Sequence, residues 1–233
     1  MKIALFGLSE INLGKHNLKD PRFDQADKMV EADKKTYAQV DVIGEDQLLE
    51  ADAILASQDS KADLLLKDLE FVETRLGRDP QPAERAALEK IQTILESDRF
   101  IFSSDLAPEE VQAVAAHSFF TNKPITVATG EELQDPDTLL VKAFAEAGYI
   151  CFLTVGGKEN RAWPIRKAMT AWEAAGTIHS DMQKGFIRAE IISFADFIAA
   201  GGETEAKRAG KQRLETKQYV MQDYDLTNFR FNK

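Results

Sequence analysis

The chain of 233 residues is poor in cysteine and contains no long hydrophobic run. Its single cysteine, Cys151, excludes an internal disulfide, and nothing else in the composition suggests a secreted fold. The apolar runs are a few residues long, far short of the roughly 20 that cross a bilayer as a helix. The opening segment KIALF is too short for the apolar core of a signal peptide. We therefore expect a cytoplasmic protein with no membrane association.

Clusters of reactive side chains are also scarce. No His, Cys and carboxylate residues have the spacing of metal ligands. His179, Ser180 and Asp181 are adjacent, so they cannot converge as base, nucleophile and orienting acid; we expect His179 to cap the C-terminus of a helix. Cys151 lies in an apolar segment and is expected to be a buried small hydrophobe. The sequence thus predicts no catalytic residue, no metal and no cofactor.

Positive charge is scarce in the front of the chain. The net charge is −10, and residues 1–144 hold 28 acidic and 16 basic side chains, whereas residues 145–233 hold 11 and 13. An acidic surface repels the phosphate backbone of nucleic acids. Any contact with RNA is therefore expected in the back half.

The front half is predicted to be an α/β domain. Apolar segments at 2–7, 37–44, 51–57 and 124–129 indicate strands. Residues 61–98 contain two amphipathic segments separated by GRDPQP, which predicts an antiparallel helical hairpin. We interpret the hairpin as a packing element, with a projecting arm for a partner as the alternative.

The segment FGLSEINLGKH, residues 6–16, follows the first strand and is similar to a phosphate-binding loop. Such a loop has four residues between its first Gly and the Gly-Lys pair, followed by a Ser or Thr that binds Mg²⁺. Here six residues separate Gly7 from the Gly-Lys pair that ends in Lys15, and His16 occupies the hydroxyl position. By itself this is weak support for a nucleotide site.

A second tetrapeptide strengthens that hypothesis. Asp41-Val-Ile-Gly44 ends a predicted strand. An Asp-x-x-Gly in this position holds Mg²⁺ and senses the γ-phosphate in GTPases. Only the order of the two motifs along the chain carries weight.

The back half has a different pattern. Two strands surround a Gly-containing turn at 149–167, a helix opens at Thr170 with Glu173 in capping-box register, and further short strands follow. This order is typical of a β-grasp, ubiquitin-like domain. We expect an α/β plus α+β protein with domains at 1–143 and 144–233.

From Phe144 to Asn232 the chain resembles the C-terminal TGS domain of the YchF-type GTPases of the Obg group. The pieces that carry this resemblance are RAWPIRK, AAGTIHSDMQKGFIRAEIIS and YVMQDYDLTNFRFN. In the front half, DPRFDQADKMVEADKKTYAQVDVIG, DLEFVETRL and FFTNKPITVATGEE are similar to segments of the same family. The resemblance implies a reduced GTPase-like domain followed by a TGS-like β-grasp domain.

Departures from that family are systematic at the nucleotide site. The phosphate loop is two residues too long, and the segment that carries the first switch is missing. Thr129 stands where the base-reading motif has Asn, although Glu132 matches its acid, and the strand and helix that should follow are absent. The resemblance therefore implies a degenerate site. Its vestigial cofactor-binding residues are Lys15, Asp41, Gly44 and Glu132.

Basic residues of the back half are predicted to form a positive face beside aromatic side chains. Such a face can bind the RNA backbone and stack bases, and the alternative is an ordinary solvated surface. The predicted interaction face consists of Arg161, Arg166, Lys167, Lys184, Arg188, Lys207, Arg208, Lys211, Arg213 and Lys217.

These features predict a non-enzymatic adaptor in which GTP hydrolysis is lost. Its partner would be RNA, the ribosome or a translation-associated protein, as the TGS resemblance implies. The alternative is a residual GTP- or ATP-binding protein or weak NTPase that uses Lys15, Asp41 and Glu132. A third hypothesis is a purely structural or self-associating protein.

Overall fold

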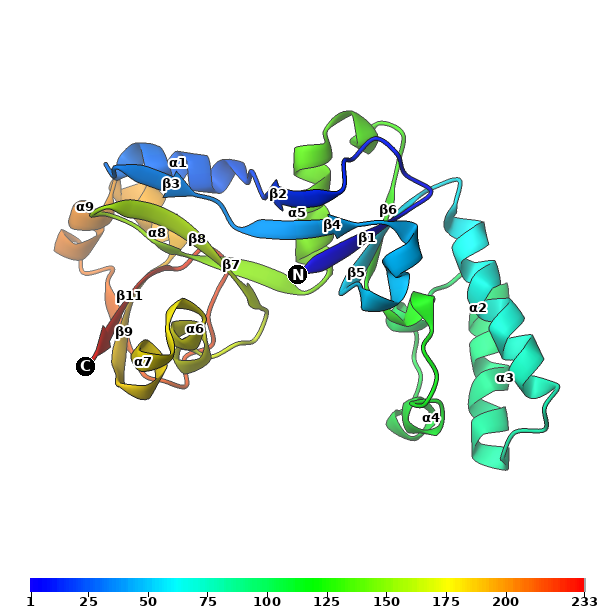
Figure 1. The fold of residues 1–233 in the computed structure, drawn as a ribbon. Helices are drawn as coiled ribbons and strands as arrows, with labels where there is room; N and C mark the ends of the chain where they lie inside the picture. The colour runs from blue at the N-terminus through cyan, green and yellow to red at the C-terminus, as the bar shows by residue number, and fades with distance from the viewer. Residues whose placement is uncertain (233) are drawn as a thin grey trace. The chain divides into compact units, whose positions relative to one another are not determined.

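The computed structural model describes residues 1–232, which form two compact units (Figure 1). Unit 1 comprises Met1–His16 and Val40–Ala147, and unit 2 comprises Asn17–Gln39 and the chain from Gly148 onward. The division predicted after residue 143 lies close to the Ala147–Gly148 boundary. The sequence placed residues 17–39 in the front domain, whereas in the structure they pack within unit 2.

Unit 1 is built on a five-stranded sheet with the order β2-β4-β1-β5-β6. Strands β4, β1, β5 and β6 are parallel, as expected for an α/β domain. The four strands predicted from the sequence are confirmed, and β2 was not predicted. The strand bounds are β1 Lys2–Phe6, β2 Gly14–Asn17, β4 Gln39–Ile43, β5 Ala53–Ser57 and β6 Ile125–Ala128.

The helical hairpin predicted over 61–98 is confirmed. Helices α2 (Lys61–Leu76) and α3 (Pro82–Glu96) pack through a buried core to which Val72, Leu88 and Ile91 contribute. A proline in the first turn of α3 starts that helix. The other helical elements of unit 1 are η1 Glu45–Glu50, η2 Ile101–Ser103, α4 Pro108–Ala113, η3 Phe120–Asn122, η4 Glu132–Gln134 and α5 Pro136–Glu146.

Unit 2 is built on a six-stranded mixed sheet with the order β10-β9-β11-β7-β8-β3. Strand β11 runs parallel to β7 and antiparallel to β9, while β3 adds to the edge of β8 in parallel. The strand bounds are β3 Lys34–Thr36, β7 Tyr149–Thr154, β8 Glu159–Arg166, β9 Phe186–Ile192, β10 Arg213–Glu215 and β11 Leu226–Phe231.

Helices complete unit 2 and bury the sheet. Phe152, Ile165, Ile191 and Phe229 from four strands form one core with the small residues of α6, which pack closely because they are alanines. The predicted capping box at the start of α6 is confirmed. The helix bounds are α1 Pro21–Met29, α6 Ala171–Ile178, α7 Ser180–Lys184, α8 Phe194–Ala200 and α9 Glu203–Arg208.

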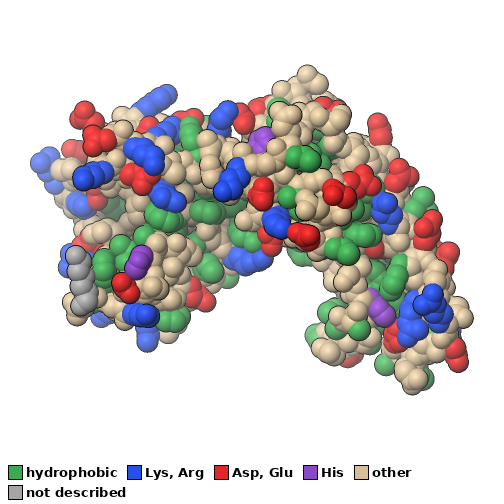
Figure 2. Space-filling model, in the orientation of Figure 1, with side chains coloured by type: hydrophobic (Ala, Val, Ile, Leu, Met, Phe, Trp, Pro, Cys, Tyr) green, Lys and Arg blue, Asp and Glu red, His purple; other side chains and the backbone are tan. Residues whose placement is uncertain are grey.

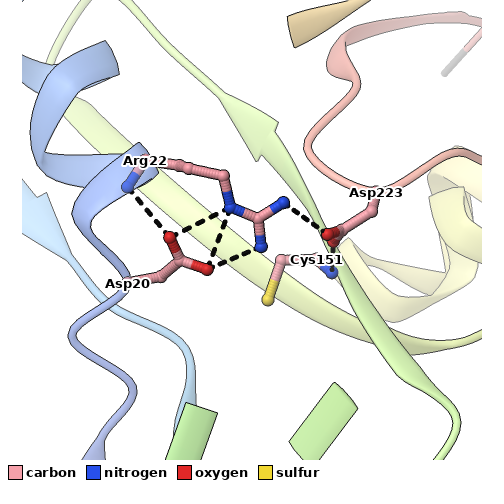
Figure 3. A network of polar contacts seen from close by, with 4 residues as sticks. All are labelled: Asp20, Arg22, Cys151 and Asp223. Atoms are coloured by element: carbon pink, nitrogen blue, oxygen red, sulfur yellow. Dashed lines mark hydrogen bonds and ion pairs between the residues drawn. The ribbon is translucent and has the colours of Figure 1, made fainter. Parts of the chain in front are cut away.

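A polar network holds the segment 17–39 within unit 2 (Figure 3). Asp20 caps α1 by accepting from the Arg22 backbone N–H, and the Arg22 guanidinium donates back to that carboxylate at 2.6 Å. Its Nη1 donates to Asp223 Oδ2 at 2.7 Å, and Asp223 Oδ1 accepts from the Cys151 N–H. The guanidinium also lies 4.0 Å from the ring centroid of Tyr224. Charge-assisted bonds thus join α1 to β7 and to the turn before β11.

Candidate functional site

The carboxyl ends of the parallel strands in unit 1 meet at one edge of the sheet. Gly7 follows β1, Gly44 follows β4 and Thr129 follows β6. The pairing of Phe6 with Ala56 brings the end of β1 level with the end of β5. Ligands of open α/β sheets bind outside this edge, so it is the first place to look for a site.

Two adjoining hollows open at this edge. The larger, of about 580 Å³, is lined by the loop after β1 and by the start of the segment after β4. The other, of about 420 Å³, shares Gly7 and Glu45 with it and extends along α2. Both volumes fall within the range of small-molecule sites. The lining residues are Leu5, Gly7, Leu8, Ser9, Ile11, Asn12, Leu13, Gly44 and Glu45 in the first and Phe6, Gly7, Glu45, Ser60, Asp63, Leu66, Lys67 and Glu70 in the second.

Gly7 is required between the two hollows. Its φ of +63° is in the left-handed region, and a Cβ at this position would overlap Ser60 Oγ. Ser60 is hydrogen bonded to Ser57 Oγ through both its hydroxyl and its backbone N–H. The Ser60 side chain, at the start of α2, therefore occupies the space that a side chain at position 7 would need.

The hollow beside α2 carries mixed charge. Glu45, Asp63 and Glu70 face a single cation, Lys67, whose Nζ lies 3.8 Å from Glu45. Carboxylates are ligands that Mg²⁺ accepts, but residues 1–232 contain no group of three or more metal-binding side chains that could hold an ion. The residues present do not form a metal site by themselves.

The structure places Lys15 in an edge strand. Gly14–Asn17 form β2, which pairs with β4 at the outer side of the sheet, and the Lys15 side chain is exposed. A phosphate loop instead leads into a helix whose first amides face the phosphate. The six residues after Gly7 therefore differ from a phosphate loop in the element that follows them, although Leu13, two residues before Lys15, lines the larger hollow.

Asp41 lies inside β4, three residues before Gly44, which lines the larger hollow. At roughly 3.3 Å per residue, it is about 10 Å from Gly44 along the strand. It pairs with Lys2 of β1, and its charge contributes to raising the pKa of Lys2, after the larger effect of Glu50. Its assignment as a vestigial cofactor-binding residue stays a prediction.

Gly44 directly follows β4, and Glu132 begins η4, four residues after β6 ends. Gly44 lines the larger hollow. Glu132 accepts hydrogen bonds from Lys142 and from the N–H and hydroxyl of Thr129. The bond from Lys142, followed by that from the Thr129 N–H, lowers the pKa of Glu132 to about 2. Its carboxylate is therefore ionised and already engaged within the turn that follows β6.

The ten residues of the predicted interaction face are not gathered in one patch. Arg213 on β10 and Arg161 on β8 are four strand spacings apart, or roughly 19 Å. Lys207, Lys211 and Arg213 pair with Glu203, Asp196 and Glu215. On the visible side of unit 2, blue and red side chains are interspersed over α1 and β3 (Figure 2). Local pairing neutralises much of the charge that the sequence suggested.

Two minor predictions can be placed. Cys151 is buried, as expected, and burial raises the pKa of its thiol. His179 does follow α6, but its Nδ1 accepts from the Asp181 N–H, so its side chain caps the start of α7 rather than the end of α6. This arrangement agrees with the prediction that His179, Ser180 and Asp181 form no catalytic triad.

Sequence reasoning missed the residues that border the hollow along α2. Ser60 directly precedes a predicted helix and Lys67 lies within it, but no motif marked them. An exposed Trp172 at the start of α6 was also missed. The available signal was positional: polar residues directly after a buried strand in an α/β pattern lie at the ligand-binding edge.

The two units thus define a mixed α/β protein with a ligand-sized opening at the carboxyl edge of its parallel sheet. The family model YchF-GTPase_C, described as a protein of unknown function (DUF933), matches residues 149–232. The structure of the Schizosaccharomyces pombe YchF GTPase has a TM-score of 0.75 at 19% identity and covers 99% of this chain and 97% of that one. This likeness concerns the fold.

Curated relatives extend the similarity to the front half. The ribosome-binding ATPase YchF of Haemophilus influenzae is 32% identical over 232 residues, which covers 73% of this chain and 64% of the relative. The protein of the same name from Bacillus subtilis is 49% identical over 96 residues, or 41% of this chain and 26% of the relative. The chain therefore spans less than two thirds of these relatives. The matches support the predicted relationship to the YchF family.

The comparisons contradict the prediction of a non-enzymatic protein. Both curated relatives are named ATPases, and the similar structure is that of a GTPase. The prediction rested on the departures at the phosphate loop, the missing segment of the first switch and the altered base-reading motif at Thr129. In the described part of the chain, no helix is long and apolar enough to cross a membrane.

Proposed function

We propose that this protein binds a purine nucleotide, hydrolyses it slowly and associates with the ribosome, as a YchF-type NTPase. The observation that carries the nucleotide assignment is the meeting of Gly7, Gly44 and the first turn of α2 around the adjoining hollows. This is the edge where α/β sheets bind nucleotides. The names of the relatives support both nucleotide hydrolysis and ribosome binding.

The chain's own groups suggest how a nucleotide would lie. Lys67 supplies a positive charge on the wall formed by α2. The neighbouring Glu45 and Asp63 repel phosphate oxygens, so we expect modest affinity. A slow rate is expected because Lys67 is the one cation that lines the hollow beside α2, so little positive charge is available to a transferring phosphoryl group.

We further infer a GTPase-derived domain over 1–143 and a TGS-like β-grasp domain over 144–233. The strand order β8-β7-β11-β9-β10, with α6 between β8 and β9, supports the β-grasp assignment. In this proposal the segment 17–39 is an addition to that domain, because β3 extends its edge. Ribosome association is assigned to unit 2, where 18 basic residues outnumber 15 acidic ones, against 11 and 24 in unit 1. Such association would place the protein in the cytoplasm.

Calorimetric titration with the magnesium salts of ATP, GTP, ADP and GDP tests the nucleotide site. We expect sub-millimolar binding and an at least tenfold loss of affinity in Lys67→Glu, because the variant removes the only cation of the hollow beside α2. Arg78→Glu makes the same charge change in the exposed turn after α2 and should leave binding unchanged. No binding of any nucleotide at millimolar concentration would contradict the proposal.

Ribosome co-sedimentation at low and high salt tests the second part independently. We expect the full chain to pellet with ribosomes at low salt and to be released as salt rises, since basic side chains contact RNA phosphates. Lys67→Glu should pellet as the wild type does. Failure to pellet at either salt concentration would overturn ribosome association and leave the nucleotide assignment standing.

A further inference from the structure

Trp172 is a large aromatic residue left at the surface of unit 2. It occupies the second position of α6, and 43% of its surface is exposed. It borders a hollow of about 300 Å³ together with Thr170, Lys217 and Gln218. Most tryptophans bury far more of their surface, so an exposed indole at the wall of a hollow points to a ligand.

The two sides of this hollow are fixed to each other by backbone bonds. The Ala171 N–H donates to the Tyr219 carbonyl at 2.7 Å, and the Trp172 N–H donates to the Lys217 carbonyl at 3.3 Å. Thr170 and Val220 form a β-bridge. The indole and the lysine are therefore held at a constant separation before any partner binds, which reduces the entropic cost of binding.

Charge at the hollow is positive and available. Lys217 is exposed, and its ammonium group forms no ion pair with any residue of the described chain, 1–232. The nearest acid along α6, Glu173, accepts from both the N–H and the hydroxyl of Thr170 and is thus directed toward the helix cap. The amides of the first turn of α6 are also occupied, so the anion-binding group at this site is the lysine.

We propose that this hollow binds one nucleotide of single-stranded RNA. The base would stack on the Trp172 indole, and the adjoining phosphate would pair with Lys217. Any base offers a flat π-face, so the site would read unpaired conformation rather than sequence. A duplex keeps its bases stacked and cannot offer one to the indole. The proposal rests on the proposed ribosome association, which it deepens by naming the contact.

Fluorescence anisotropy with a labelled twelve-residue oligouridylate tests the site. We expect binding by the full chain, at least tenfold weaker binding by Trp172→Ala and Lys217→Glu, and near wild-type binding by Trp172→Phe, which keeps an aromatic face. Phe102→Ala removes a comparably exposed aromatic from unit 1 and is the matched control. In a Trp163→Phe background, the oligonucleotide should quench the emission of the remaining tryptophan. A blunt-ended RNA duplex should compete poorly.

The outcomes separate this inference from the proposal on which it rests. Equal oligouridylate binding by the wild type and Trp172→Ala would overturn the inference, as would absence of quenching. If Trp172→Ala loses the oligonucleotide and also pellets less with ribosomes, both proposals are supported. If ribosome pelleting by Trp172→Ala is unchanged, the hollow is not the ribosomal contact, while ribosome association itself stands. Selective binding of an acidic peptide in place of RNA would also overturn the inference.

Discussion

The two units differ in how many of their structural features are formed by residues that are close together in the sequence. In unit 2 most strands, the turn residues and the helix cap follow one another from residue 149 onward, and the strand pairs are local except for those of β11 and for the pair of β3 with β8. In unit 1 the edge of the sheet joins four segments that lie far apart in the chain. Motifs in unit 2 could be recognised from contiguous residues. The site in unit 1 could not, because it depends on how the strands align with one another.

Two buried carboxylates, Asp68 in unit 1 and Asp20 in unit 2, have different kinds of partners. Unit 1 places an isolated carboxylate, Asp68, in the core of the helical hairpin, with 2% of its surface exposed. Unit 2 uses the Arg22 network, in which two carboxylates share one guanidinium. Removing a buried carboxylate leaves its neutral donors without partners and away from water, which costs more free energy of unfolding than breaking a half-exposed ion pair that water can partly replace. Substitutions at the two sites should therefore have unequal effects.

The largest effect is expected at Asp68. Its carboxylate accepts from the Phe120 N–H at 3.0 Å and from the N–H and hydroxyl of Thr121, each at 2.7 Å. Asp68→Ala leaves two amides and a hydroxyl without partners in a buried position, so we expect a loss of about 3 kcal/mol in the free energy of unfolding. Urea denaturation followed by circular dichroism measures this loss.

Asp63→Ala is the matched control for Asp68, because Asp63 is exposed on the same helix. It should change stability by no more than about 0.5 kcal/mol, the typical effect of a first-turn acid. Burial raises the pKa of Asp68 despite its three hydrogen bonds. If Asp68→Ala lost less free energy of unfolding than Asp63→Ala, the three hydrogen bonds of Asp68 would contribute nothing to the stability of the hairpin.

A smaller effect is expected at Arg22 in unit 2. Arg22→Ala leaves the buried Asp20 without its guanidinium and breaks the bond to Asp223. Because the Arg22 side chain is 45% exposed, water replaces part of the interaction, and we expect a loss of about 1–2 kcal/mol. Limited proteolysis should then cleave within 17–39 faster than in the wild type.

Arg22→Lys sharpens the test because it keeps the charge and removes the planar fork. One ammonium cannot bond both carboxylates and lie over Tyr224 with the same geometry, so only partial recovery is expected. Lys28→Ala, an exposed change on the same helix, should have little effect. Equal proteolysis of Arg22→Ala and the wild type would show that other contacts hold the segment, such as the bonds of Asn160 to Asp27 and Val30.

Much of the fold was predictable from local patterns. The hairpin over 61–98 and the capping box at Thr170 were correct because apolar spacing and caps are short-range features. The pairing of Asp41 with Lys2 was not predictable, since an Asp-x-x-Gly tetrapeptide carries no information on which residue of β1 it faces. The bond between Glu132 and Lys142 was not predictable either, because it depends on how α5 packs.

The turn before β11 offers the smallest test, and it concerns pH. The Tyr219 hydroxyl donates to Asp225 Oδ2 at 2.9 Å, and burial, followed by the charge of Asp225, raises the pKa of Tyr219 to about 12. A phenol with a raised pKa stabilises the folded state below its ordinary pKa near 10 and loses that contribution as pH rises toward about 12. In the folded protein the phenol holds its proton where the unfolded chain has released it.

Tyr219→Phe should therefore be less stable than the wild type at pH 9 and should lose that deficit by pH 12. We expect the difference between the two proteins to shrink by about 1 kcal/mol over this interval, less than the full shift implies because the hydroxyl is partly exposed. Arg213, which donates to the same hydroxyl at 3.0 Å, opposes the rise in the pKa of Tyr219 without reversing it. Urea denaturation of both proteins at four pH values measures the difference. A difference that stays constant from pH 9 to 12 would mean that Tyr219 and Asp225 do not share a proton-sensitive contact.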